Sequence, residues 1–308
     1  MKIFSNQWVR MGLTVLLLGL VIAKIQPVRL LHALGGADSR YAALAFLLTI
    51  PFLYLRALRW HLMLRAASIE TVFWESGLSL IGGMGLALIT PARLGELVRA
   101  AYLRDPQKLR IGGLVMIDKA FDVIVLAALS GAGAWHLLGP LPGAALLAVA
   151  VAGLAAIYAP EQVSRSLHFV AGRTRFERNL RDIIGAAESL SFRATTIFLA
   201  LTVASFAVVM LQFAVILLSW RSWSLDIILL TFPLVILTNI LPITIGGLGV
   251  REGAAAVLLA HYGVPSADAA LTALISSGFN TYLPGVVGAL LFPIAPGRRT
   301  SAQSVKGS

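Results

Sequence analysis

Two stretches of the sequence place a proline, glycines and a charged pair between long apolar runs. The clearer stretch reads NILPITIGGLGVRE at residues 239–252 and ends in Arg251 and Glu252. Where apolar runs cross a membrane, backbone freed by Pro and Gly and ionisable side chains are tolerated only if they are buried in protein or line a wet cavity. The stretch therefore predicts a functional site. Its candidate hinge residues are Pro242, Gly246, Gly247 and Gly249.

A weaker copy of this pattern lies about 150 residues earlier and reads ALITPARLGELVR at residues 87–99. Its candidate hinge residues are Pro91 and Gly95, and its charged residues are Arg93, Glu96 and Arg99. Hydrophobic segments interrupted by Gly and Pro at matching places in two halves are typical of a substrate site between membrane repeats. The plainer interpretation is that both stretches are ordinary loops with helix caps.

Asp118 and Asp122 are four residues apart in the run DKAFD and would share one face of a helix, with Lys119 three residues from Asp122. If that helix starts at Ile111, Asp118 lies roughly 10 Å along it. A charge at the bilayer centre costs about 2.5–3.5 kcal/mol even on the lenient insertion scale, so the two acids should face the interior and find partners. The candidate partners are Arg93, Arg99 and Arg251. The alternative is a shifted helix start that puts the three charges at the cytoplasmic interface, with the Lys119 ammonium group extended toward water.

The charged residues of the two stretches each have a functional and a structural interpretation. Arg251 begins a predicted half-helix whose unpaired N–H groups and dipole favour an anion, and an arginine adds a bidentate phosphate donor. In the alternative, Arg251 and Glu252 form an ion pair that only braces the turn. Glu96 and Arg99, three residues apart, either line the site or form an ordinary helix-stabilising pair.

No catalytic or cofactor-binding template is present in the sequence. The five His residues are scattered without metal-ligand spacing, and there is no GxSxG nucleophile elbow, Walker loop or dinucleotide fingerprint. The chain also has no Cys, which excludes disulfides, thiolate metal sites and Cys nucleophiles. We therefore expect no enzyme activity, no metal and no cofactor.

The composition is that of a membrane protein. Hydrophobic residues make up 58% and charged residues 13% of the 308 residues, and no segment is polar and long enough for a separate soluble domain. We treat residues 1–308 as a single membrane domain, with a hydrophobic part at about 10–293, a basic cytoplasmic linker at 160–193 and a cytoplasmic tail at 294–308. The net charge of +11 comes from Lys and Arg beside hydrophobic runs, which indicates topology and anionic lipid rather than nucleic acid.

The hydrophobic runs and the basic clusters predict an all-α polytopic membrane protein with about six full spans and two re-entrant helical hairpins. The predicted spans are residues 11–23, 41–58, 111–138, 143–159, 194–220 and 267–292, and the predicted hairpins are 77–103 and 225–260. Arg56, Arg59 and Arg65 follow the second span and indicate the cytoplasmic face, where both termini also lie. The hairpins then enter from opposite faces as an inverted repeat, which is an architecture of transporters.

Five segments of the chain carry a family resemblance. They are RALRWHLML at 56–64, TPARLGELVRAAYL at 90–103, DKAFD at 118–122, LPITIGGLGVREG at 241–253 and HYGVPSADAA at 261–270. Together they resemble the signatures of the lysylphosphatidylglycerol synthase transmembrane family over about residues 10–293. The resemblance implies a bacterial inner-membrane protein that moves or handles a polar lipid between leaflets, without the soluble aminoacyltransferase domain of two-part members. Asp118 and Lys119 stand where the third motif of that family more often has Glu-Arg.

We predict a lipid flippase or lipid transporter whose head-group cavity lies between the two hairpins. The residues expected to line it are Arg93, Glu96, Arg99, Asp118, Asp122, Arg251 and Glu252. In this mechanism the Arg residues and the half-helix N-terminus hold the lipid phosphate, while the acyl chains stay in the bilayer through a lateral opening. The expected ligand is a membrane lipid with a phospholipid, glycolipid or hopanoid head group. The alternatives are a membrane-embedded lipid-modifying enzyme that uses Asp118, Asp122 and Glu252, and a non-catalytic membrane partner of a lipid-biosynthetic enzyme.

Overall fold

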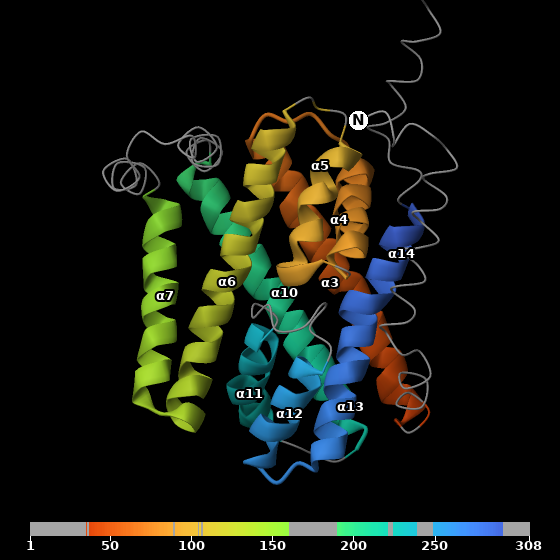
Figure 1. Ribbon diagram of the computed structural model, residues 1–308, viewed down its shortest axis with the longest axis vertical. Coiled ribbons are helices and arrows are strands. Elements are labelled where there is room, and N and C mark those ends of the chain that lie inside the picture. Colours follow the sequence, from red (N-terminus) through yellow and green to blue (C-terminus); the bar gives the residue numbers. More distant parts are fainter. Residues whose placement is uncertain are drawn as a thin grey trace, which may run out of the picture.

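The computed structural model of the protein describes residues 35, 37–88, 90–103, 105, 107–159, 190–220, 224–238 and 249–291. All regular structure among these residues is helical, which confirms the predicted all-α class. The long helices lie side by side in one bundle, with α7 at one edge of it (Figure 1). The predicted first span at 11–23, most of the linker at 160–193 and the tail at 294–308 lie outside the described residues.

Long helices form the frame of the bundle. They are α3 (Ser39–Ala66), α6 (Lys108–Leu138), α7 (Pro140–Tyr158), α10 (Phe192–Leu218) and a continuous rod made of α13 (Ser266–Ser277), the π-turn η5 (Gly278–Tyr282) and α14 (Leu283–Leu291). Within the described part of the chain, α3, α7, α10 and the rod at 266–291 are long and apolar enough to cross a membrane. Helix α6 is as long as these but carries charged residues in its interior. The prediction of six crossings therefore stays a prediction.

Two groups of short helices fill the bundle from opposite ends (Figure 1). The first group, called the first short pair, has two arms. One arm is α4 (Phe73–Ala87), and the other is the 3-10 helix η2 (Pro91–Val98) followed by the single turn α5 (Arg99–Tyr102), which pack against α4. The second short pair is α11 (Leu225–Leu237) and α12 (Val250–Ala260), which pack against each other. These pairs occupy the stretches in which hairpins are predicted, and their relation to the two faces of a bilayer stays a prediction.

The return segment of the first short pair differs from the predicted half-helix, because most of it is a 3-10 helix. The Thr90 hydroxyl donates to the Leu86 carbonyl at 3.0 Å and accepts from the Gly95 N–H at 2.7 Å, which holds the chain close to the end of α4. A Cβ on Gly95 would lie 2.3 Å from the Leu86 carbonyl carbon. Only a glycine allows this close approach, so Gly95 sets how tightly the chain turns.

The π-turn within the 266–291 rod has a local cause. Pro284 has no backbone N–H, so the helical hydrogen bond to the carbonyl of Asn280 cannot form. The preceding N–H, that of Leu283, bonds to the carbonyl of Gly278 five residues back. This wider turn presents Asn280 and Thr281 toward the interior of the bundle, where both side chains are buried.

Small residues let the rod approach the first short pair. A Cβ on Gly288 of α14 would lie 1.9 Å from the Ile81 carbonyl oxygen of α4, and a Cβ on Gly85 would lie 2.5 Å from the Ala289 nitrogen. Such backbone contacts are typical of helices packed in a membrane, where small residues replace the hydrophobic driving force. The position of α4 in the bundle is therefore fixed by the rod.

Candidate functional site

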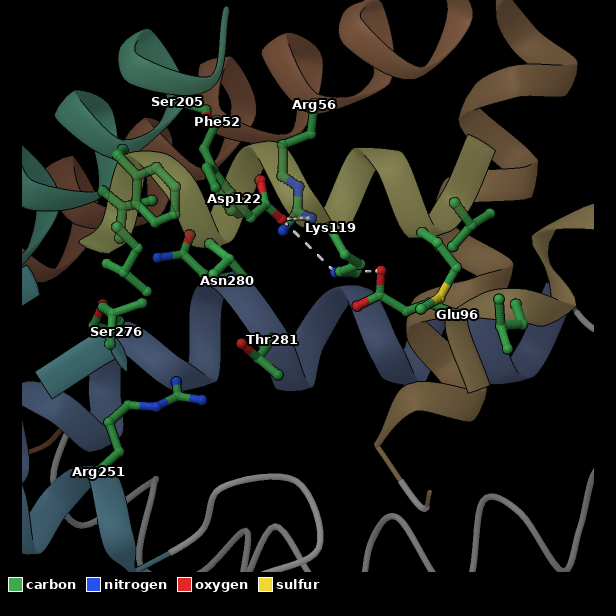
Figure 2. A pocket seen from close by; sticks show the side chains of 18 residues that line it. Phe52, Arg56, Glu96, Lys119, Asp122, Ser205, Arg251, Ser276, Asn280 and Thr281 are labelled. Atoms are coloured by element: carbon green, nitrogen blue, oxygen red, sulfur yellow. Dashed lines mark hydrogen bonds and ion pairs between the residues drawn. The ribbon is translucent and has the colours of Figure 1, made fainter. Parts of the chain in front are cut away.

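A cavity of about 400 Å³ is lined by residues of both short pairs. Its wall includes Glu96 and Leu97 from η2, Ile236 from the end of α11 and Arg251 from the start of α12. The remaining lining residues come from α3, α6, α10, α13 and η5 (Figure 2). Both predicted hairpin stretches thus contribute to one site.

Arg59 on α3 is the centre of a buried ion-pair cluster. Its Nη2 lies 2.7 Å from Oδ1 of Asp118 and 2.8 Å from Oδ1 of Asp122, both on α6. Its Nη1 donates a hydrogen bond of 2.5 Å to Oγ1 of Thr202 on α10. The side chains of Arg59 and Asp118 are 1% and 2% exposed, a depth at which charges persist only when paired and hydrogen-bonded. The cluster therefore fixes α3, α6 and α10 relative to one another.

Arg99 ties the first short pair to this cluster. Its Nη1 donates a hydrogen bond of 2.8 Å to Oδ2 of Asp118, and its Nη2 bonds to the carboxylate of Glu96. The guanidinium carbon lies 5.3 Å from the centroid of the Trp60 ring, within the range of a cation–π contact. A Cβ on Gly83 of α4 would lie 2.5 Å from Cγ of Arg99, so this glycine makes room for the buried side chain.

Part of the charge cluster lines the cavity. These residues are Arg56, Glu96, Lys119 and Asp122. Lys119 Nζ lies 2.6 Å from Oε2 of Glu96 and 3.8 Å from Oδ2 of Asp122, and Arg56 Nη2 lies 3.1 Å from Oδ2 of Asp122. The side chain of Lys119 is 29% exposed, compared with 11% for Arg56 and 20% for Asp122. These are the groups of the cluster that a ligand in the cavity would reach.

Arg251 lines the same cavity from the second short pair (Figure 2). It is 5% exposed, and its Nη1 donates a hydrogen bond to Oγ of Ser277 on α13. Glu252 is not among the lining residues. Its Oε2 instead accepts a hydrogen bond of 2.6 Å from the backbone N–H of Gly249, as the acidic residue of a capping box does. The start of α12 thus already holds a carboxylate of its own chain.

A neutral polar wall lies between the two charged regions. It is formed by Ser276, Asn280 and Thr281 of the rod. Oε1 of Gln212 on α10 accepts hydrogen bonds from Ser276 Oγ at 3.3 Å and from Asn280 Nδ2, and its Nε2 donates to the Ala45 carbonyl of α3 at 2.8 Å. Gln212 therefore fixes this wall to α10 and α3.

The charges around the site leave a positive surplus. The cluster contains four cations, Arg56, Arg59, Arg99 and Lys119, and three acids, Glu96, Asp118 and Asp122. Among the described residues of the cluster the difference is therefore +1, and Arg251 and its neighbour Glu252 add no net charge.

The structure divides the predicted site residues into separate settings. Glu96, Asp122 and Arg251 line the cavity. Arg99 and Asp118 form ion pairs behind the wall, and Glu252 caps α12. The Arg93 side chain, Pro242, Gly246 and Gly247 lie outside the described parts of the chain, Pro91 begins η2, and Gly249 precedes α12 with φ +83°.

The start of α6 differs from the predicted one, and the choice between the two interpretations of the acidic run stays a prediction. The helix begins at Lys108 rather than at the predicted Ile111, so Asp118 lies roughly 15 Å along it. Asp118 is 1% exposed, so it is buried in the protein whatever its depth in the bilayer. Lys119 turns toward the cavity and contacts Glu96.

Sequence reasoning missed several residues of the site, among them Arg56, Arg59, Lys119 and Asn280. Arg56 and Arg59 are predicted as markers of the cytoplasmic face, whereas the structure buries Arg59 against Asp118. Their spacing contained the signal: two arginines three residues apart lie on one face of an otherwise apolar helix. Such a face suits partners for acids on another apolar helix.

Comparison with known proteins agrees with the resemblance carried by the five segments. A family model described as the lysylphosphatidylglycerol synthase TM region matches residues 7–288. The chain is 27% identical over 294 residues to a UPF0104 membrane protein of Methanothermobacter thermautotrophicus, an alignment that covers 84% of this chain and 86% of that protein. No solved structure matches the chain.

Proposed function

This chain belongs to the lysylphosphatidylglycerol synthase transmembrane family and is a multi-pass membrane protein, and from that premise we propose that it is a lipid flippase or lipid transporter. The polar head group of a membrane lipid binds in the cavity, and the lipid moves between leaflets. One observation carries the proposal: charged residues from both short pairs, α3 and α6 meet around a single cavity in a chain that is otherwise strongly apolar. Charges at membrane depth mark substrate pathways when they face the interior.

The proposed topology has six crossings, with the two short pairs as re-entrant hairpins that enter from opposite leaflets. The inner membrane is the proposed location, with both termini in the cytoplasm. Supporting this, the interior charges of α6 contact charged partners on α3, η2 and α5. The broken helices also end at the cavity, where irregular backbone is tolerated in a membrane.

In the proposed binding mode, the head-group phosphate contacts Lys119 and Arg56 on one side and Arg251 on the other. Arg59 and Arg99 do not take part directly, because their guanidinium groups are bonded to Asp118 behind the wall. Glu96 and Asp122 hold the ammonium and guanidinium groups in place and reduce the net positive charge. A moderate surplus suits transport, because the head group must leave the site as well as enter it.

Transport rather than lipid modification is proposed because the acids of the site already bind cations. Glu96 contacts Arg99 and Lys119, and Asp122 contacts Arg56 and Arg59. A carboxylate held in this way stabilises its partner and is poorly placed to take a proton from a substrate. The role proposed for these acids is therefore to orient the cations of the site.

The test compares Arg251→Gln with Arg110→Gln in proteoliposomes of phosphatidylcholine that contain phosphatidylglycerol labelled on an acyl chain. Arg110 is a matched control because its side chain makes a solvent-exposed hydrogen bond to Gln107 and does not line the cavity. A charge-assisted hydrogen bond contributes about 1.5–3 kcal/mol, so loss of the Arg251 contact should slow translocation about tenfold or more. Arg110→Gln should leave the rate unchanged. An Arg251→Gln protein that moves the labelled lipid at the full rate would contradict the proposal.

A further inference from the structure

Two apolar lining residues of the cavity are more exposed than its other described apolar lining residues. Phe52, Val115, Leu126 and Val209 line the cavity and are 8%, 1%, 4% and 7% exposed, so the wall is closed where they lie. Leu97 and Met116 also line the cavity, but they are 38% and 46% exposed. The mouth of the cavity therefore lies between η2, which carries Leu97, and α6, which carries Met116.

At this mouth, apolar residues lie on the outside and charged residues lie further inside. Leu97 follows Glu96 directly in η2, and Met116 precedes Lys119 by three residues and so lies on the same face of α6. Glu96 and Lys119 contact each other at 2.6 Å inside the cavity. Each side of the mouth thus has an apolar residue outside and a charged residue inside. A lipid has the same order, with an apolar chain followed by a polar head group.

In the proposed topology, the mouth opens toward hydrocarbon rather than toward water. Met116 is eight residues into α6, or roughly 12 Å from its start at Lys108, which places it within the span proposed for this helix. A large apolar side chain that is exposed at this depth faces acyl chains. In that topology, a ligand that passes between Leu97 and Met116 comes from the bilayer.

We infer that the cavity takes its lipid sideways through the mouth between η2 and α6, with an acyl chain lying against Leu97 and Met116 while the head group reaches Lys119. This inference rests on the proposed function and specifies the ligand class: an amphiphile with a hydrocarbon chain, not the free phosphate ester of the same head group. The cavity of about 400 Å³ lies in the range of small-molecule sites and suits a head group. An acyl chain extends about 15 Å, half of the hydrocarbon core, so it remains outside the mouth.

The chain contains no Cys, so a single introduced thiol can be labelled selectively. Met116→Cys is labelled in detergent with a bulky maleimide, the extent of labelling is measured by mass spectrometry, and the protein is reconstituted. Because the label is attached after folding, the unlabelled sample of the same variant is the reference. The matched control is Leu109→Cys, which lies on the same helix, is 70% exposed and does not line the cavity.

Two measurements are made on each sample: translocation of acyl-labelled phosphatidylglycerol, and the phospholipid that stays bound through gentle purification. Labelling at position 116 should abolish most of both, relative to the unlabelled variant, because the bulky group fills the mouth. Labelling at position 109 should change neither. Equal values for labelled and unlabelled Met116→Cys would overturn the lateral route while leaving the transport proposal standing. An unmodified protein that neither moves nor retains phospholipid would overturn the proposed function, and the lateral route with it.

Discussion

In the first short pair, Glu96 and Arg99 are bonded to each other and are 1% and 0% exposed, and both connect to charged residues of α6. In the second short pair, Glu252 bonds to the backbone of Gly249, and Arg251 donates to a serine hydroxyl on α13. The same residue types therefore have different surroundings. Both charged residues of the first pair bond to other charged side chains, whereas in the second pair Glu252 caps a helix and Arg251 bonds to a hydroxyl at the cavity wall.

The neighbouring long helix accounts for this difference. Helix α6 presents Asp118 to the first short pair, so a second buried guanidinium is compensated and Arg99 can be fully buried. Helix α13 presents the neutral Ser277 hydroxyl to the second short pair, where Arg251 also lines the cavity. Removing a charge from the first pair should reduce stability, and removing Arg251 should reduce transport.

The largest expected effect is the loss of stability in Asp118→Asn. Asp118 accepts ion-pair contacts of 2.7 Å from Arg59 and 2.8 Å from Arg99, both almost completely buried. Removing one partner of a buried pair costs about 3–5 kcal/mol, because a desolvated charge is left without compensation. The free energy of unfolding, measured by denaturant titration in detergent micelles, should fall by that amount.

The control for this variant is Asp226→Asn in the first turn of α11, part of the second short pair. Asp226 is exposed, so its carboxylate is already in contact with solvent. Its replacement should change stability only slightly. If the two asparagine variants unfolded at the same denaturant concentration, the buried ion-pair cluster would not stabilise the fold as inferred here.

Much of the fold could be predicted because apolar runs and basic clusters depend only on local composition. The predicted span at 194–220 corresponds to α10, and the predicted span at 111–138 corresponds to α6. The sequence also predicts Glu96 and Arg251 as lining residues because they lie near Pro and Gly in apolar runs, and Asp122 because a charge inside an apolar span must face inward.

The partners of the buried acids could not be predicted in the same way. Arg59 contacts Asp118 from 59 residues away, and that contact depends on how α3 and α6 are rotated about their axes. Local periodicity shows which residues share a face but not which faces meet. The 3-10 form of η2 depends likewise on the tertiary contact of Gly95 with Leu86. Basic residues near a helix end are therefore ambiguous between surface markers and buried partners.

A second prediction uses matched glycines in the two short pairs. Gly95→Ala places a Cβ 2.3 Å from the Leu86 carbonyl carbon, and overpacking of this kind costs about 1–3 kcal/mol. Gly253→Ala in α12 places a Cβ where no heavy atom lies within 4 Å, and Ala in an open helical position stabilises by about 0.5–1 kcal/mol over Gly. Unfolding free energies of the two variants should therefore change in opposite directions. A change in the same direction would show that the first pair is not the more tightly packed of the two.

The smallest expected effect is a loss of stability at Glu252, which should be less than the loss at Glu96. Glu252→Ala removes the acceptor for the Gly249 N–H and an acidic group from the first turn of α12, which should cost about 0.5–1 kcal/mol of unfolding free energy. Glu252→Gln keeps an acceptor oxygen and should lose less. Glu96→Gln should be more destabilising than either, because Arg99 loses a buried charge partner. If Glu252→Gln remained fully stable yet slowed lipid translocation as much as Arg251→Gln, Glu252 would act on the ligand rather than as a cap, and the two short pairs would be more alike in function than their contacts indicate.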